Sequence, residues 1–199
     1  MKKILLVVSA FALCAVTQQA NAGGTSGFNN GFYYFTYYTG NGSTSITFPG
    51  GGGNFRGTWT SGVSDSLCGK GWSPGSIRNI GFNNGQLSGN WHSAGAYGWA
   101  PYPQVEWYIT EYGANSGTFS GTVNSDGGTY NVYKGTQGGG PQYKNDRQVD
   151  RAIGSNSTIT MANHVNKWRS LGWSFGTIRE TVYMAEAFGG PGTANATVW

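Results

Sequence analysis

The chain has 199 residues, among them 35 Gly, 8 Trp, 12 Tyr and 10 Phe, and its 12 Lys and Arg residues outnumber 8 Asp and Glu. The basic residues are scattered and form no run or stripe, which excludes the charge pattern of a nucleic-acid-binding protein. The two Cys and two His lie in unrelated segments without metal-ligand spacing, so we expect no metal and no other cofactor.

The N-terminus has the pattern of a secretory signal peptide. Two lysines precede an apolar stretch at residues 4–16, and residues 20–22 form a small-x-small cleavage pattern. We therefore expect residues 1–22 to be removed on export, with cleavage near Ala22. Residues 23–199 should form a single domain, since their number suits one hydrophobic core. The sequence leaves open whether the protein stays in a periplasm or becomes extracellular.

Beyond the signal peptide, the chain alternates between aromatic or β-branched stretches and short segments rich in Gly, Asn and Asp. This pattern, with almost no helical periodicity, predicts an all-β fold in which two curved antiparallel sheets pack together. The predicted strands are residues 28–38, 45–48, 54–59, 107–111, 118–123, 129–133, 157–161 and 181–188. The predicted turns are residues 40–42, 50–53, 83–85 and 126–128.

One segment near the C-terminus breaks this pattern. Val165, Trp168 and Leu171 recur at three-residue spacing, and Gly172 follows as a C-terminal stop signal. The spacing predicts a helix over residues 162–171 that docks its apolar side on a sheet.

Two of the eight acidic residues lie in strand-like runs, residues 103–110 and 181–188, that are dense with aromatic residues. Glu106 shares a strand face with Tyr108, and Glu186 shares one with Phe188, because successive side chains of a strand alternate. A carboxylate among aromatic rings is costly unless that face is a working cleft. Two such carboxylates suggest glycoside hydrolysis; the alternative is a pair of strand carboxylates on a solvated face. Glu111 faces away from Glu106 by the same alternation, which indicates a structural role.

A series of ordered motifs runs along nearly the whole chain. They are Asn-Asn-Gly-Phe-Tyr-Tyr at residues 29–34, Gly-Lys-Gly-Trp at 69–72, Tyr-Gly-Trp at 97–99, Val-Glu-Trp-Tyr at 105–108, Ser-Asp-Gly-Gly-Thr-Tyr at 125–130, Asn-His-Val-Asn at 163–166 and Ala-Asn-Ala-Thr-Val-Trp at 194–199. This series resembles family 11 of the glycoside hydrolases, the small endo-1,4-β-xylanases. The resemblance implies a β-jelly roll of two curved antiparallel sheets with one α-helix.

The resemblance also implies roles for individual residues. Glu106 would be the nucleophile and Glu186 the general acid/base of a cofactor-free endo-1,4-β-xylanase. Retention of configuration then requires carboxyl groups about 5–5.5 Å apart, whereas about 6.5–9.5 Å would indicate inversion. Tyr97 and Tyr108 would hydrogen-bond the nucleophile and the sugar ring. The partner would be xylan or a xylo-oligosaccharide, with no nucleic acid and no membrane, and the protein would be a secreted monomer.

Further positions match the family's cleft with substitutions. Gln142 matches a cleft glutamine, Tyr37 takes the place of a stacking Trp, and Phe188 stands where a Tyr is usual. Each aromatic replacement keeps a stacking face and changes the polar contacts. Asp65 lies where family members carry Asn or Asp beside the acid/base, and Asp goes with acidic optima. We hypothesise that Asp65 shares a proton with Glu186, so that the productive state is populated at low pH.

The chain departs from the family after residues 131–133. Family members carry a long hairpin there, tipped by Pro-Ser-Ile, which folds over the bound sugar; here only residues 134–141 separate Tyr133 from Gln142. We expect a lid shortened to a glycine-rich turn, which should weaken sugar binding and turnover without abolishing two-carboxylate chemistry. Two alternatives stay open: a non-catalytic carbohydrate-binding protein on the same fold, and a hydrolase of a related β-glycan.

Overall fold

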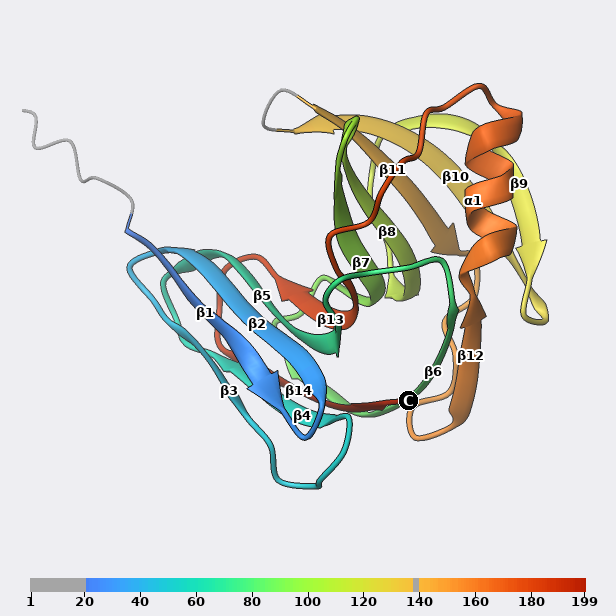
Figure 1. Ribbon diagram of the computed structural model, residues 1–199. Helices are drawn as coiled ribbons and strands as arrows, with labels where there is room; N and C mark the ends of the chain where they lie inside the picture. The colour runs from blue at the N-terminus through green and yellow to red at the C-terminus, as the bar shows by residue number, and fades with distance from the viewer. Residues whose placement is uncertain (1–20, 138–139) are drawn as a thin grey trace, which may run out of the picture.

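The computed structural model describes residues 21–137 and 140–199. Most of the predicted signal peptide, and the tip of the shortened hairpin, therefore lie outside the described residues. The described chain forms fourteen strands and one helix (Figure 1). The strands are β1 (Ala22–Asn29), β2 (Phe32–Gly40), β3 (Thr44–Thr47), β4 (Asn54–Trp59), β5 (Val63–Trp72), β6 (Asn79–Gly89), β7 (Ser93–Pro101), β8 (Gln104–Gly113), β9 (Thr118–Ser125), β10 (Gly128–Gln137), β11 (Gly140–Arg147), β12 (Asn156–Thr160), β13 (Thr181–Ala187) and β14 (Gly192–Val198), and the helix is α1 (Met161–Ser170).

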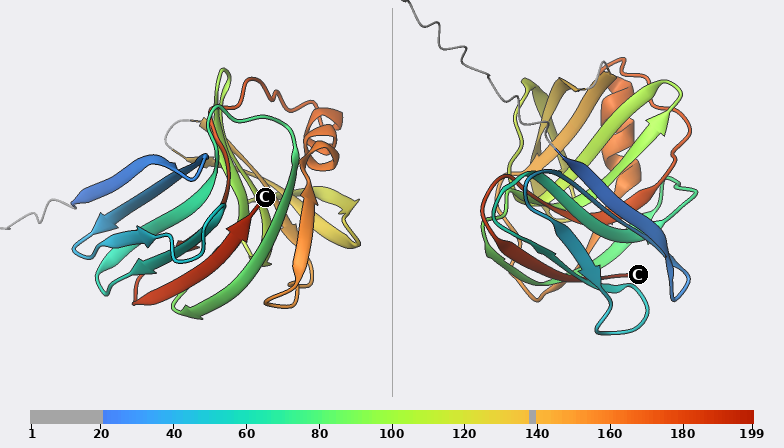
Figure 2. Two further views of the ribbon diagram at one scale, coloured as in Figure 1. Left: turned by 60° about the horizontal axis from the view of Figure 1, so that its bottom comes forward. Right: turned by 90° about the vertical axis from the view of Figure 1, so that its left-hand side faces the viewer.

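The strands build two curved sheets that lie one over the other (Figures 1 and 2). The larger sheet has nine strands in the order β1-β2-β5-β13-β7-β8-β11-β10-β9, and the smaller has five in the order β12-β6-β14-β4-β3. Neighbouring strands are antiparallel except β8 and β11, which run parallel. The predicted jelly-roll fold with one helix is confirmed for the described residues, and the parallel β8–β11 pair is the departure from a purely antiparallel arrangement.

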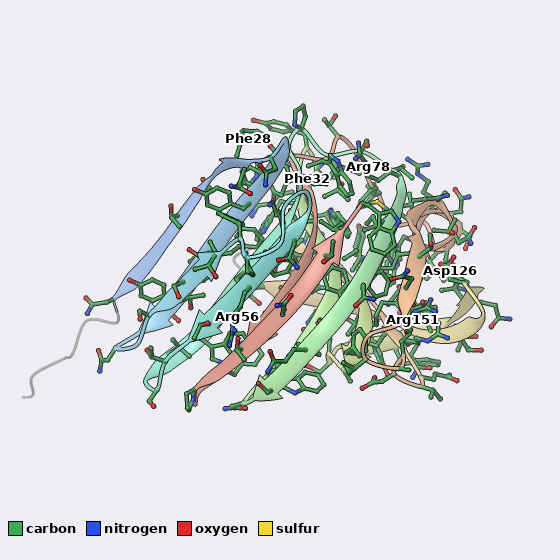
Figure 3. All side chains as sticks on the ribbon, turned by 90° about the horizontal axis from the view of Figure 1, so that it is seen from below. Phe28, Phe32, Arg56, Arg78, Asp126 and Arg151 are labelled. Carbon is green, nitrogen blue, oxygen red and sulfur yellow. The ribbon has the colours of Figure 1, made fainter. Side chains whose placement is uncertain are left out.

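Apolar side chains from both sheets fill the space between them. Phe82 of the smaller sheet stacks on Tyr183 of the larger one, with ring centroids 4.7 Å apart. In β4, Phe55 and Trp59 face this core, whereas Arg56 between them is exposed on the outer face (Figure 3). Removing this apolar surface from water is the main favourable contribution to folding.

The helix confirms its sequence prediction. Val165 and Trp168 are buried, and the Trp168 ring packs 5.2 Å from that of Phe175. Gly172 follows with φ +76°, a left-handed conformation that glycine adopts without strain and that ends a helix. No helix in the described part of the chain is long and apolar enough to cross a membrane.

Several strands escaped the sequence analysis. The stretch predicted as one strand, residues 28–38, is two strands joined by a turn in which Asn30 and Gly31 have positive φ. The turn predicted at residues 83–85 instead lies inside β6, where the pairing register with β14 shifts. The strands that were missed are β5, β6, β7, β11 and β14; each contains Gly, β6 is rich in Gly and Asn, and β11 is mostly polar. Pairing and burial on the sheet decide their conformation, because strand propensity depends strongly on context.

Candidate active site

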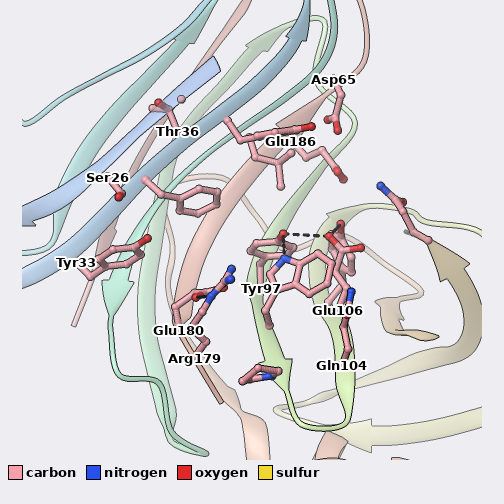
Figure 4. A pocket seen from close by; sticks show the side chains of 18 of the residues that line it. Ser26, Tyr33, Thr36, Asp65, Tyr97, Gln104, Glu106, Arg179, Glu180 and Glu186 are labelled. Atoms are coloured by element: carbon pink, nitrogen blue, oxygen red, sulfur yellow. Dashed lines mark hydrogen bonds and ion pairs between the residues drawn. The ribbon is translucent and has the colours of Figure 1, made fainter. Parts of the chain in front are cut away.

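Strand alternation sends one set of side chains from the larger sheet to the face opposite the core. Trp107 and Ala185 point into the core, whereas their neighbours Glu106 and Glu186 point the other way. A cleft of about 900 Å³ opens on this second face (Figure 4). Its aromatic lining consists of Tyr33, Phe35, Tyr37, Tyr97, Trp99, Tyr102 and Tyr108. Aromatic faces with a few convergent polar groups are suited to binding sugar rings.

Glu106 is held at the bottom of this cleft by three uncharged donors. Tyr97 and Tyr108 donate their hydroxyl hydrogens to Oε1 over 3.0 and 2.9 Å, and Gln142 donates from Nε2 to Oε2 over 2.6 Å. The sheet order explains this convergence, because β7 and β11 flank β8 and Gln142 is directly opposite Glu106 in the register. Both carboxylate oxygens are therefore satisfied and fixed in direction, with 5% of the residue exposed.

The two tyrosines are themselves fixed. Their rings lie 5.0 Å apart, and the Tyr97 oxygen accepts a hydrogen bond from Trp99 Nε1 over 2.6 Å. Burial is the largest cause that raises the pKa of both phenols well above the usual value, and the charge of Glu106 adds to it. Both hydroxyls therefore stay protonated and remain available as donors.

Glu186 faces the same cleft from strand β13, which β7 separates from β8 in the sheet. Ser93 Oγ donates to its Oε2 over 3.0 Å, and 4% of the residue is exposed. Burial first, and then the negative charges of Asp65 and Glu106, raise the pKa of Glu186 to about 8. A raised pKa is what a carboxyl group needs in order to hold a proton that it could later donate.

Asp65 lies beside Glu186 at one end of the cleft. Burial raises the pKa of Asp65 to about 6, with a further contribution from the charge of Glu106. Among the described residues its buried Oδ1 has no hydrogen-bond partner. A proton shared between Asp65 and Glu186 stays a prediction, because no hydrogen bond joins them in the described chain.

The remaining predicted site residues differ in their position. Tyr37 lines the cleft with 41% of its surface exposed, so its ring is open to a sugar. Phe188 is also exposed, but among the described residues it packs on His92, with ring centroids 4.7 Å apart, and does not line the cleft. Glu111 lies on the opposite face of β8, as the alternation predicted, and forms an ion pair with Arg151 in the interior.

The shortened hairpin reaches the active site. The register of β10 and β11 continues to the pair Gln137 and Gly140. Gln137 lines the cleft, and its Oε1 accepts a hydrogen bond from Gln142 Nε2 over 2.8 Å. Gln142 therefore uses its amide group to bridge Gln137 and Glu106. The tip of the predicted glycine-rich turn, residues 138–139, lies outside the described residues.

Among the polar residues at or beside the cleft that sequence reasoning missed, Ser93, Arg179 and Glu180 make side-chain contacts that bear on the site. Ser93 gave no signal, because a small polar residue in an unpredicted strand is unremarkable. Arg179 and Glu180, just before β13, form an ion pair that lines the cleft. Glu180 lies six residues before Glu186, so strand parity would have placed both on one face had the strand been extended to it.

The carboxyl groups of the cleft are not arranged to bind a metal ion. Within residues 21–137 and 140–199, no group of three or more His, Cys, Asp or Glu side chains could hold one.

Glu186, whose pKa is raised, and Glu106, which three hydrogen bonds hold, face one aromatic cleft from two strands of the same sheet, and two carboxyl groups in such a cleft suit glycoside hydrolysis. The family model of glycosyl hydrolases family 11 matches residues 29–197. The chain therefore belongs to glycosyl hydrolases family 11, as its motifs predicted.

Three curated relatives extend this comparison. "Endo-1,4-beta-xylanase B" of Phanerodontia chrysosporium is 36% identical, covering 98% of this chain and 74% of its own length. "Endo-1,4-beta-xylanase Xyn11B" of Cellvibrio japonicus is 34% identical, over 98% of this chain and 60% of its own length. "Endo-1,4-beta-xylanase B" of Penicillium oxalicum is 36% identical, over 95% of this chain and 66% of its own length. The chain thus spans between 60% and 74% of the length of these relatives.

Proposed function

We propose that this family 11 enzyme is an endo-1,4-β-xylanase that hydrolyses internal bonds of xylan with retention of configuration. The observation that carries the proposal is the pairing of Glu106, held by three neutral donors, with Glu186, whose pKa is raised to about 8. The xylanase names of the relatives support the choice of substrate. The cleft volume of about 900 Å³ and its aromatic lining suit a chain of several sugars.

In the first step, the Glu106 carboxylate attacks the anomeric carbon of the bound sugar. Glu186 gives its proton to the glycosidic oxygen, so the bond to the leaving sugar breaks as the glycosyl–Glu106 ester forms. Tyr97, Tyr108 and Gln142 hold the attacking carboxylate in place, which avoids reorganisation at the moment of reaction.

In the second step, Glu186 acts as a base. Formation of the ester removes the negative charge of Glu106, and that charge is one of the causes that raise the pKa of Glu186. The now ionised Glu186 takes a proton from water, and the oxygen of that water attacks the anomeric carbon. The ester breaks, Glu106 is regenerated, and two inversions give net retention.

The proposal includes export and a single catalytic domain. Residues 1–22 are the signal, cleaved near Ala22, and residues 23–199 act as a secreted or periplasmic monomer without nucleic-acid or membrane partners. Cleavage after Ala22 removes one residue of β1 and leaves the rest of that strand. Mass determination of the exported protein and its sedimentation in solution test these two points.

The experiment that tests the function is the release of oligosaccharides from unsubstituted xylan by the wild type, Glu106→Ala and Glu186→Ala. Short xylo-oligosaccharides from the wild type alone are expected. Binding of xylan without cleavage by all three proteins would favour a carbohydrate-binding protein. Cleavage of another β-glycan in place of xylan would favour a hydrolase of that polymer.

A further inference from the structure

The cleft contains an ion pair that the two-carboxylate chemistry does not use. Arg179 and Glu180 precede β13 and lie in the cleft between Tyr33 and Tyr97 (Figure 4). Among the described residues that line the cleft, Arg179 is the single basic one. The Glu180 side chain is buried, and a buried carboxylate is costly unless it is paired, which accounts for its contact with Arg179. It does not account for the exposed side of the Arg179 guanidinium.

One edge of the Arg179 guanidinium hydrogen-bonds Glu180, and another edge has no partner within the described chain. Arg179 donates from Nε and Nη2 to the two Glu180 oxygens over 2.5 and 3.0 Å. A guanidinium carries five N–H groups in a planar fork. Within the described chain, both hydrogens of Nη1 and one of Nη2 have no partner, so the outer Nη1–Nη2 edge is a second, unoccupied fork.

The exposed fractions of the two side chains indicate which member of the ion pair can contact a sugar in the cleft. The Glu180 side chain is 6% exposed, whereas the Arg179 side chain is 62% exposed. Glu180 therefore acts as the anchor that orients the guanidinium, and Arg179 is the group presented to the cleft. The Arg179 Cζ atom lies 6.0 Å from the Trp99 ring, and Trp99 hydrogen-bonds Tyr97 beside Glu106. The fork thus lies next to the catalytic centre.

The backbone that carries the fork is held on both sides. Arg179 N–H donates to the Trp99 carbonyl over 2.7 Å, and the Arg179 carbonyl accepts from Gly75 N over 3.0 Å. Gly98 permits the close approach of this segment, because a Cβ there would lie 2.0 Å from the Glu180 carbonyl oxygen. A fork on a fixed backbone loses little freedom when it binds.

We propose that Arg179 is a specificity-determining residue, whose free Nη1–Nη2 edge donates to two neighbouring oxygens of a sugar in the cleft. This rests on the proposed function, since it names a contact for the same polysaccharide. Two sources present such oxygens: the vicinal hydroxyls of a backbone xylose, and the carboxylate of an acidic side-chain sugar. The hydroxyl pair is favoured, because Glu180 already balances the Arg179 charge and the cleft holds further carboxyl groups that repel an anion.

The test measures KM and kcat of Arg179→Gln on neutral xylohexaose and on a xylo-oligosaccharide that carries one glucuronic acid. Loss of a charge-assisted contact made alike in ground and transition states should raise KM about tenfold or more and leave kcat nearly unchanged. An equal rise on both substrates identifies the hydroxyl pair, whereas a larger rise on the acidic substrate identifies the carboxylate. Unchanged KM on both substrates would overturn the proposal.

Two further variants distinguish loss of the Arg179 contact from a general loss of stability. Arg179→Lys retains the charge beside Glu180 but not the planar fork, so it should keep the unfolding temperature and still show the raised KM. A wild-type KM in Arg179→Lys would mean that the charge alone matters, contrary to the proposal. Arg169→Gln, the same change at the exposed end of α1, is the matched control.

Binding measurements distinguish failure of the Arg179 proposal from failure of the proposed xylanase activity. If the wild type does not cleave xylan, calorimetric titration with xylohexaose still compares the wild type and Arg179→Gln. Weaker binding by the variant would support the fork without turnover, and equal binding would overturn it.

Discussion

Strand β8 carries two buried glutamates, and they face opposite sides of the larger sheet. Glu106, on the cleft side, accepts hydrogen bonds from uncharged phenol and amide groups alone among the described residues. Glu111, on the interior side, accepts from Tyr130 over 2.6 Å and is paired with the guanidinium of Arg151. Neutral donors fix a carboxylate without cancelling its charge, whereas a cation cancels it. The same residue type is therefore held by neutral groups on one face and paired with a cation on the other, which fits the proposed nucleophile role of Glu106 and a structural role of Glu111.

Substitution of each glutamate should affect a different property of the enzyme, and the loss of activity at Glu106 should be the largest change. Glu106→Ala should lower kcat roughly 10⁴-fold or more, because the nucleophile is lost. Glu111→Gln should leave kcat nearly unchanged and lower the free energy of unfolding by about 3 kcal/mol, because the interior cation loses its partner. Initial rates on xylan and urea unfolding of both variants check this. If Glu111→Gln lost activity in its folded state, the division of roles between the faces would be wrong.

A second prediction applies the same change to a tyrosine on each face. Tyr97→Phe removes a donor to Glu106 and should lower kcat about 10²-fold, by analogy with loss of one donor to a reacting oxyanion. Tyr130→Phe removes a donor to Glu111 and should cost about 1.5–3 kcal/mol of stability with kcat unchanged. Equal kinetic losses in the two variants would contradict the comparison.

A third prediction concerns stability and pH. The pKa of Glu186 is raised to about 8 from a usual value of 4.5, so the native state binds this proton more tightly than the unfolded state does. The contribution of Glu186 to stability is therefore largest below about pH 4.5 and is lost as pH rises through about 8. Urea unfolding of the wild type and of Glu186→Gln between pH 4 and 9 isolates this contribution. A difference between the two proteins that does not change with pH would rule it out.

The smallest expected effect is a shift of the pH–rate profile in Asp65→Asn. If Asp65 and Glu186 share a proton in the productive state, the alkaline limb of the wild type follows the Asp65 pKa of about 6. Replacing Asp65 should then move that limb to higher pH. If Asp65 acts through its charge alone, its removal lowers the pKa of Glu186 and moves the limb to lower pH. A limb that moves down, or does not move, would reject the shared proton.

The part of this picture that the sequence could predict depends on local periodicity. Strand parity separated Glu106 from Glu111, and three-residue spacing with a terminal Gly172 located the helix. The family resemblance added Tyr97 and Tyr108, which both contact Glu106 in the structure.

The rest depends on which strands become neighbours, and local sequence does not carry that information. Ser93 meets Glu186 because β7 pairs with β13. The family resemblance named Gln142 as a cleft residue, but its position opposite Glu106 depends on the parallel pairing of β11 with β8, two strands that are not consecutive in the chain. Arg179 and Glu180 lie at a bend before β13, and their contact depends on that bend, which the sequence pattern does not indicate.

The proposed mechanism requires a covalent bond between Glu106 and the sugar, which trapping of the intermediate would reveal. The enzyme would be treated with a 2-fluoro-xylobioside bearing a good leaving group, digested with protease and examined by mass spectrometry, while nuclear magnetic resonance follows the first product from xylohexaose. We predict a glycosyl adduct on the peptide that contains Glu106, and a first product of β configuration. An α-configured product without an adduct would mean direct attack by water, and Glu106 would then be a base and not a nucleophile.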